Sequence, residues 1–227
     1  MSGPGAAVCG GPTLRSMDDT SWTTVEDSES LTALLGEPAQ RARDKERDHL
    51  LDIDRAWLAA SPFCVLATAG ADGTCDASPK GDPVGSLVHV LDDRTIAVAE
   101  RPGNRRVDGY RNVLENPHVG LLFLVPGRGD TLRVNGRARL VSDAPFLDEM
   151  VVRGHRPVLA LVVEVEQVFF HCSKAFLRSG LWDPEGWAPD GSVPRRAVIA
   201  HEVEPDGRSI EELDAYYGPS YADGLYG

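Results

Sequence analysis

The sequence contains few cysteines, and their spacing matches no metal-binding or disulfide pattern. The four cysteines lie far apart, at Cys9, Cys64, Cys75 and Cys172. Zinc sites and disulfide frameworks use closely or regularly spaced cysteines, so the sequence indicates neither. We therefore predict no metal ligand set.

Long apolar runs and an excess of positive charge are also missing. No run is long enough to span a bilayer, and no signal-peptide core is seen near the first residue. The formal net charge of −12 argues against a general binder of nucleic acid or anionic membranes. We expect a cytoplasmic protein with neither partner. The hydrophobic content of 42% suffices for one domain with extensions.

One segment is basic, although the chain as a whole is acidic. Residues 101–139 hold eight arginines and only three acidic residues. The arginines are Arg101, Arg105, Arg106, Arg111, Arg128, Arg133, Arg137 and Arg139. A basic island in an acidic protein favours a small anionic ligand over a polyanion.

The stretch 100–117 predicts a helix that follows a buried strand over 95–99. Pro102 and Gly103 interrupt the strand, and Asn104 is a good helix N-cap. Helical spacing predicts a buried face made of Val107, Tyr110 and Leu114. The pair Asn116-Pro117 ends the helix, because a residue before proline disfavours the helical region.

Arg105 and Arg106 would then occupy the first turn of that helix. Cations at this end oppose the helix macrodipole, so the pair is a poor choice for helix stability alone. An anion held by backbone N–H groups and guanidinium groups would explain the pair. A solvated, charged first turn is an equally good interpretation of this stretch alone.

The rest of the chain divides by composition. We predict a flexible tail over 1–27, a helical extension over 28–60, a β-rich domain over 61–183 and a C-terminal extension over 184–227 with weak signals. Helices are expected at 30–35 and 39–60. No internal repeat is present.

The β-rich part predicts a small antiparallel barrel, a mainly β (α+β) fold with inserted and flanking helices. Strands are expected at 63–69, 75–78, 86–91, 95–99, 119–125, 131–141, 158–165 and 168–170, and helices at 104–115, 143–152 and 174–179. Residues 79–83 contain too many turn formers for a strand interior. The strand 131–141 alternates apolar and polar residues, and Gly136 in its middle indicates a bend or bulge.

The motifs along this barrel resemble those of the pyridoxamine 5′-phosphate oxidase-like flavoproteins, the FMN-binding split barrels. The resembling residues are Ala67-Thr68 with Asp72-Gly73, then 78–82, 101–106, 116–117 and 131–136, within residues 60 to 180. The forms of the segments 78–82 and 101–106 look most like an uncharacterised bacterial FMN-dependent subgroup. The resemblance implies a split β-barrel, FMN as cofactor and a homodimer with the flavin site between subunits.

The resemblance also assigns residues to the cofactor site. They are Ser78, Pro79, Lys80, Gly81, Asp82, Ala99, Glu100, Asn104, Arg105, Arg106, Thr131, Arg178 and Trp182. Arg105 and Arg106 would hold the FMN phosphate, and 78–82 would contact flavin and phosphate. Thr131 stands where the oxidase has a glutamine, and Trp182 is also typical of a packing residue. The arginines of the 131–141 strand are expected on a solvent face or near the dimer interface.

The implied function is that of an FMN-dependent oxidoreductase acting on an unidentified small molecule. No residue is an evident general acid or base, so the catalytic residues are unknown and the cofactor would carry the chemistry. The alternatives are a non-catalytic FMN-binding or electron-carrier module and a deazaflavin-dependent reductase. Oxidation of pyridoxine 5′-phosphate is not expected, because the arginine-and-histidine segment near the oxidase's C-terminus has no counterpart in the acidic, tyrosine-rich end of this chain.

Overall fold

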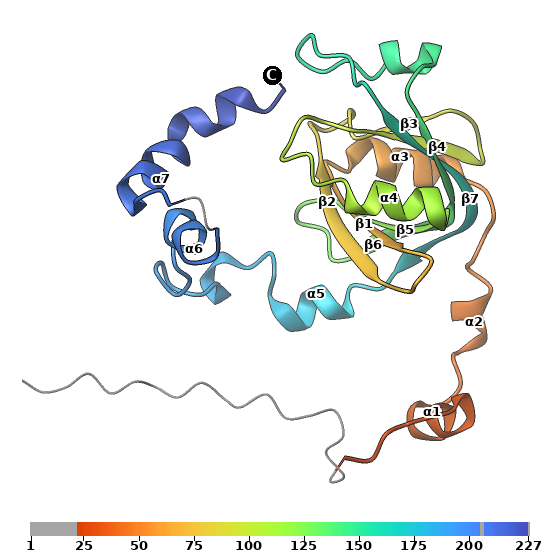
Figure 1. Ribbon diagram of the computed structural model, residues 1–227. Helices are drawn as coiled ribbons and strands as arrows, with labels where there is room; N and C mark the ends of the chain where they lie inside the picture. Colours follow the sequence, from red (N-terminus) through yellow and green to blue (C-terminus); the bar gives the residue numbers. More distant parts are fainter. Residues whose placement is uncertain (1–21, 205–206, 227) are drawn as a thin grey trace, which may run out of the picture. The chain divides into compact units, whose positions relative to one another are not determined.

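The computed structural model describes residues 22–204 and 207–226, and it divides into one unit ending at Arg43 and a second beginning at Asp44 (Figure 1). The described part of the first unit holds α1 (Ser28–Leu35) and the short α2 (Gln40–Arg43). Asp27 caps α1 by accepting the N–H of Ser30 at 2.7 Å, and Gly36 ends it. Most of the predicted tail lies outside the described residues.

The prediction of one helix over 39–60 was wrong. The second unit starts its helical part only at α3 (Asp52–Ala60), and Arg47 instead forms a β-bridge with Val168. The Arg47 guanidinium also pairs with the fully buried carboxylate of Asp54. An ion pair that satisfies a buried charge outweighs a weak local helix preference.

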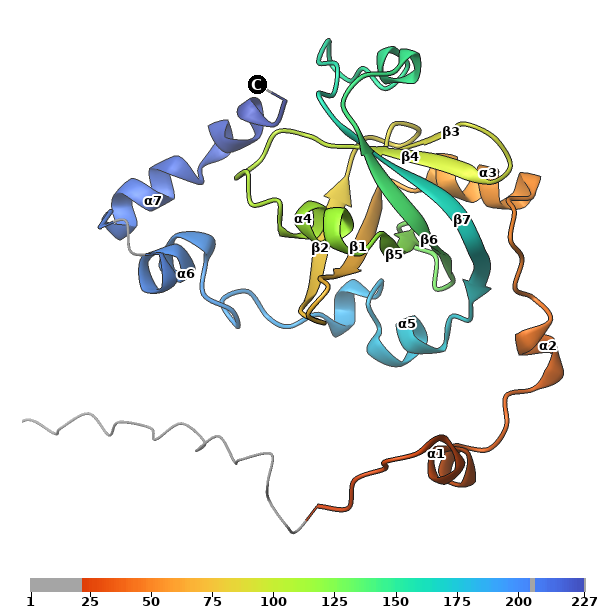
Figure 2. The ribbon, with the colours of Figure 1, turned by 45° about the vertical axis from the view of Figure 1, so that its right-hand side comes forward.

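Seven antiparallel strands form one sheet in the described residues, in the order β2-β1-β5-β6-β7-β4-β3. Their bounds are β1 (Phe63–Ala69), β2 (Cys75–Gly81), β3 (Val88–Val90), β4 (Thr95–Ala99), β5 (His118–Leu124), β6 (Thr131–Val141) and β7 (Ala160–His171). Figure 2 shows how strongly β6 and β7 curve. The predicted mainly β, antiparallel architecture is confirmed.

The longest pairing joins β6 to β7, and it contains the predicted irregularity at Gly136. The register shifts between Asn135 and Gly136, and a Cβ on Gly136 would lie 1.9 Å from the carbonyl oxygen of Glu164. Only glycine fits there. The sequence predicted two strands over 158–170, whereas β7 continues without interruption.

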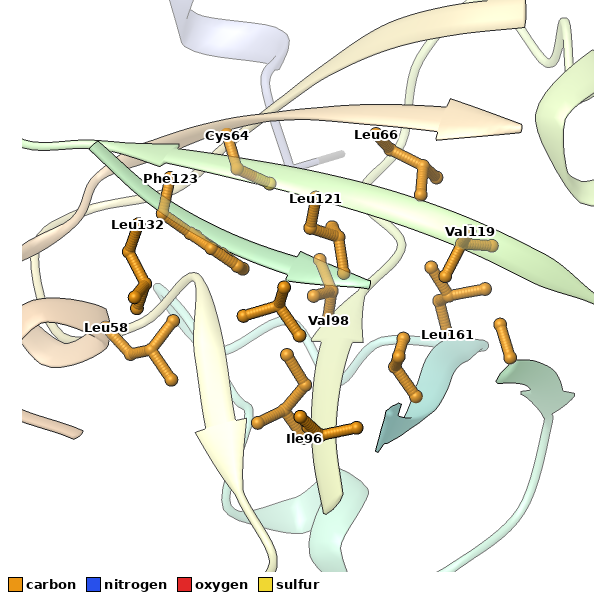
Figure 3. Packing of buried hydrophobic residues seen from close by; sticks show 14 of the residues in the cluster. Leu58, Cys64, Leu66, Ile96, Val98, Val119, Leu121, Phe123, Leu132 and Leu161 are labelled. Atoms are coloured by element: carbon orange, nitrogen blue, oxygen red, sulfur yellow. The ribbon is translucent and has the colours of Figure 1, made fainter. Parts of the chain in front are cut away.

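The core fills the inside of the curved sheet (Figure 3). Fully buried side chains come from α3 and from strands far apart in sequence, including Leu58, Leu66, Ile96, Phe123 and Leu132. Because these residues converge from both halves of the sheet, the sheet and α3 form one packed body.

Helix α4 (Asp108–Glu115) is inserted between β4 and β5, and it contacts β1, β2 and β6 (Figure 1). Tyr110 and Val113 form its buried face, whereas Leu114 is 75% exposed, so the prediction for Leu114 was wrong. The helix ends before Asn116 as predicted.

The remaining elements are short. They are η1 (Pro145–Asp148), α5 (Lys174–Ser179), η2 (Pro184–Gly186), α6 (Arg196–Val203), α7 (Ile210–Tyr216) and η3 (Pro219–Gly224). The helix predicted over 143–152 is only the 3-10 turn η1, whereas α5 ends at Gly180 as predicted. Sequence signals missed α6 and α7, which share a small core of Ala197, Ala200 and Leu213. In the described ranges, no helix has the length and apolar character needed to cross a membrane.

Candidate functional site

A cavity of about 580 Å³ lies next to the loop between β4 and α4. Its walls come from seven residues between Glu100 and Tyr110, from residues 155–159 and from Tyr226 near the end of the chain. These three regions are distant in sequence, so only the fold brings them together. The volume falls in the range of roughly 300–1,000 Å³ typical of small-molecule sites.

The loop that leads into α4 differs from the prediction. Helix α4 begins at Asp108, so Arg105 and Arg106 lie before the helix and not in its first turn. The side chain of Asn104 accepts the backbone N–H of Arg106 at 2.9 Å, and Arg105 between them has a left-handed backbone with φ 60°. This side-chain turn reverses the chain before the helix can start.

The two arginines differ in their surroundings. Arg105 lines the cavity, and it has no carboxylate partner among the described residues. The Arg106 guanidinium instead pairs with Asp108, with Nε 2.6 Å from Oδ2, and its side chain is 78% exposed. Asp108 takes the first helical turn, where an acidic residue suits the macrodipole. Arg105 is therefore the cation of this pair that remains free for a ligand.

Residues 79–81 continue strand β2, so the prediction that residues 79–83 contain too many turn formers for a strand interior was wrong for them. β2 is an edge strand of the sheet, and Pro79 is tolerated there because one side of an edge needs no ladder hydrogen bonds. Ser78 and Lys80 are half-buried, whereas Pro79 and Gly81 are exposed on the other face. The strand thus turns Ser78 and Lys80 towards α4.

Lys80, Glu100 and Tyr110 form one connected cluster at the cavity. The Lys80 ammonium lies 3.1 Å from Oε2 of Glu100 and 4.6 Å from the centre of the Tyr110 ring. The Tyr110 hydroxyl donates to the same oxygen of Glu100. Burial, reinforced by this hydrogen bond, raises the pKa of Tyr110. Tyr110 therefore stays protonated, and two donors hold the Glu100 carboxylate.

Asp82 and Arg101 form a second, more deeply buried pair. Nε of Arg101 lies 2.6 Å from Oδ2 of Asp82, with side chains 12% and 2% exposed. Arg101 also donates to the carbonyl oxygen of Met150 at 2.9 Å. Its Nη1 is buried and has no hydrogen-bond partner within the described structure. The sequence predicted Asp82 as a cofactor contact, whereas its nearest partners are Arg101 and the hydroxyl of Tyr226, at 2.7 Å.

A second part of the cavity wall carries basic residues that sequence analysis missed. His155 and Arg156 line the cavity, and Arg153 beside them has a left-handed backbone with φ 50°. Arg156 is paired with Asp148, with Nε 2.5 Å from Oδ1. The segment 153–156 has no strand or helix pattern, and only its cluster of basic residues could have indicated it.

Several predicted site residues do not line this cavity. Ala99 is buried at the end of β4, and Asn104 serves the backbone of Arg106. Thr131 is buried at the start of β6, opposite His171 on β7. Arg178 lies on the short helix α5. Trp182 stacks on Phe176 and donates its Nε1–H to the carbonyl oxygen of Arg128 at 2.7 Å, which is a packing arrangement.

Metal ligands are not gathered anywhere in the part of the chain that the structure describes: no group of three or more histidine, cysteine, aspartate or glutamate side chains is placed to hold an ion. Cys172 and His171 follow one another at the end of β7, and the Cys172 thiol is exposed. The N–H of Lys174 lowers the pKa of Cys172 by hydrogen bonding, and the ammonium group of Lys174 adds to the effect.

The family model described as "Pyridoxamine 5'-phosphate oxidase" matches residues 51–172. No curated protein matches the chain.

Solved structures also resemble the chain. HupZ of Group A Streptococcus has 19% identity and a TM-score of 0.43, over 53% of this chain and 93% of that one. A putative pyridoxamine 5′-phosphate oxidase from Lactobacillus delbrueckii has 22% identity and a TM-score of 0.43, over 54% and 95%. An FMN-binding protein from Syntrophomonas wolfei has 14% identity and a TM-score of 0.40, over 53% and 89%. At this level of similarity, what these proteins bind says nothing about the ligand of this chain.

Proposed function

Because the chain belongs to the pyridoxamine 5′-phosphate oxidase family, we propose that it is an FMN-dependent oxidoreductase acting on a small molecule. Membership, together with the curved antiparallel sheet, establishes the split β-barrel fold. The proposal places the FMN phosphate at Arg105, in the loop between β4 and α4. It goes beyond the family, whose membership fixes neither cofactor nor reaction for this chain.

The proposal rests on the surroundings and the backbone conformation of Arg105. It lines the cavity without a carboxylate partner in the described structure, although the chain as a whole is strongly acidic. It also keeps a left-handed backbone, which costs a non-glycine residue about 1–2 kcal/mol. Strained conformations cluster at binding sites, because a ligand can offset their cost.

The other lining residues also fit FMN. Arg101 also lines the cavity, and its buried Nη1 has no hydrogen-bond partner within the described structure. Pro102, Val107 and Leu159 supply apolar walls that suit a planar ring system. A site with apolar walls and a few cationic groups matches a flavin that ends in a phosphate.

In this proposal, bound FMN supplies the hydride or electron chemistry. The chain's own residues bind and orient the ligands. Glu100 is held by Lys80 and Tyr110, so its carboxylate keeps one position at the cavity wall. The Tyr110 proton stays on the hydroxyl oxygen, because that hydroxyl is buried against a carboxylate.

We further propose a homodimer with the flavin site between the subunits. Arg178, which is exposed on α5 and does not line the cavity, would then reach the site of the second subunit. The exposed Arg137 and Arg139 on β6 would lie near the interface or the mouth of the site. Light scattering at micromolar concentration should give the mass of a dimer, and a monomer with FMN bound would contradict this arrangement.

The substrate is proposed to differ from pyridoxine 5′-phosphate. The acidic, tyrosine-rich segment 207–226 brings Tyr226 to the cavity and contains no histidine, so it is no counterpart of the oxidase's arginine-and-histidine segment. Oxygen uptake by the FMN-loaded protein with pyridoxine 5′-phosphate should stay at background. Uptake at the rate of an authentic oxidase would contradict the proposal.

The decisive experiment is a mass spectrum of the cofactor released when the purified protein is denatured. FMN is expected, and a deazaflavin would show the alternative reductase. Anaerobic reduction by NAD(P)H, followed by reoxidation with a panel of acceptors, then separates an enzyme from a carrier. An enzyme should prefer particular acceptors, whereas absence of any preference would indicate an electron carrier. Failure to bind either flavin would refute the proposed function.

A further inference from the structure

Tyr226 connects the end of the chain to the cavity. Its hydroxyl donates to Oδ1 of Asp82 at 2.7 Å, across 144 positions of sequence. Its ring lies 6.1 Å from the His155 ring with an interplanar angle of 28°. The guanidinium groups of Arg101 and Arg153 lie 5.8 and 5.4 Å from the ring centre. One side chain thus contacts two lining residues from separate segments, Arg101 and His155.

These contacts are specific to Tyr226 within its segment. Tyr226 is the single residue from the C-terminal segment 207–226 that lines the cavity. Tyr216, Tyr217 and Tyr221 contact one another instead. The apolar core of α6 and α7 is likewise separate from the core of the sheet. Packing of the helical pair therefore does not account for the position of Tyr226.

We propose that Tyr226 is a ligand-binding residue of the cavity, which it reaches from the segment 207–226. The inference rests on the proposed function, because the ligand it names is FMN. The phenol ring gives the cavity an aromatic wall against which a planar ligand can pack. The Asp82 hydrogen bond and the two guanidinium groups hold that wall in place.

The electrostatics of the site support this role. Asp82 is a buried carboxylate that already has Arg101 as a partner, and the Tyr226 hydroxyl satisfies its second oxygen. The Arg153 guanidinium lies against the neutral ring of Tyr226, and it forms no ion pair with a carboxylate of the described residues. Tyr226 thus adds no negative charge that would cancel the charge of either arginine. Since Asp82 already balances the charge of Arg101, Arg153 is the group here that can attract an anionic ligand.

The test compares full-length Y226A, Y226F and Y221A with the wild type by titration of flavin fluorescence with FMN. Y226A removes the aromatic wall and should raise the dissociation constant about tenfold or more. Y226F keeps the ring but loses the bond to Asp82, so a smaller rise of about two- to tenfold is expected. Y221A is the matched control, because Tyr221 belongs to the same segment without lining the cavity. Its dissociation constant should stay within about twofold of wild type.

A second readout needs no ligand. In hydrogen exchange of the unliganded proteins, amides of residues 80–84 and 153–159 should exchange faster in Y226A than in wild type or Y221A. Unchanged exchange in Y226A would show that Tyr226 does not contact these segments. An unchanged or lower FMN dissociation constant in folded Y226A would show that Tyr226 does not bind the ligand. If wild type binds no FMN, the proposed function itself fails. That result differs from binding that is merely insensitive to Tyr226.

Discussion

Arg105 offers the sharpest test of the site, because its neighbour Arg106 is a natural control. Both are arginines in one loop, but only Arg105 lines the cavity, and Arg106 is paired with Asp108. A hydrogen bond to a charged group contributes about 1.5–3 kcal/mol. Because Arg105 is exposed, the lower end applies, which corresponds to about a tenfold loss of FMN affinity in R105A. R106A should change the affinity less than about twofold, as is usual for an exposed pair.

The backbone of Arg105 adds a stability measurement to the same series. R105A and R105G lose the same side-chain contacts, so their FMN affinities should be equally low. Relief of the left-handed conformation favours glycine by about 1–2 kcal/mol, and the greater freedom of glycine in the unfolded chain removes about 0.4–1 kcal/mol of that. R105G should therefore be more stable than R105A by roughly 0.5–1 kcal/mol, or about 1–4 °C in Tm for a protein of this size.

FMN titration and thermal unfolding of the four proteins decide between the possible results. Wild-type FMN affinity in R105A would refute the placement of the phosphate. Equal losses in R105A and R106A would show that the loop binds the anion in another conformation. An R105G protein less stable than R105A would contradict the left-handed backbone at this position.

Three further predictions concern Tyr110, Gly136 and the cysteines. Y110F should lower the free energy of unfolding by about 1.5–3 kcal/mol in urea denaturation, because the Glu100 carboxylate loses a donor; an unchanged midpoint would contradict that bond. G136A should cost about 3 kcal/mol or more, or prevent folding, since its Cβ would lie 1.9 Å from a carbonyl oxygen of β7; a variant as stable as wild type would show that the bulge is misplaced. With iodoacetamide near pH 7, Cys172 should react well before Cys64. The lowered pKa of exposed Cys172 favours its thiolate, whereas burial raises the pKa of Cys64 to about 12. Mass spectrometry of the labelled peptides measures this, and early labelling of Cys64 would count against it.

Local patterns were sufficient for two strands of the barrel. The run 95–99 and the alternating run 131–141 became β4 and β6 with the predicted bounds. The irregularity at Gly136 was also predictable, because a glycine inside an alternating strand usually marks a bulge or a close approach of another backbone segment. These features depend on residues close together in sequence.

Other features depend on contacts that no local pattern encodes. Residues 79–81 form a strand because they pair with β1, and their turn preference is overridden. The start of α4 was misplaced because an asparagine can accept the same kind of backbone hydrogen bond in a helix cap and in a turn before a helix. Tyr226 was missed because nothing in the sequence relates it to Asp82.

The residues with a strained backbone at this cavity are also positively charged. Within the described residues, Arg105 and Arg153 are the two non-glycine residues with a positive φ. Both are arginines, one lining the cavity and the other touching the Tyr226 ring at its wall. Glycine would avoid the cost of the left-handed backbone at both positions, so fold stability alone does not explain an arginine at either of them. A bound anion can offset the cost of a left-handed backbone only where the guanidinium groups reach that anion. For this reason we propose that the anionic part of the ligand lies between the loop before α4, which carries Arg105, and the segment 153–156, which carries Arg153.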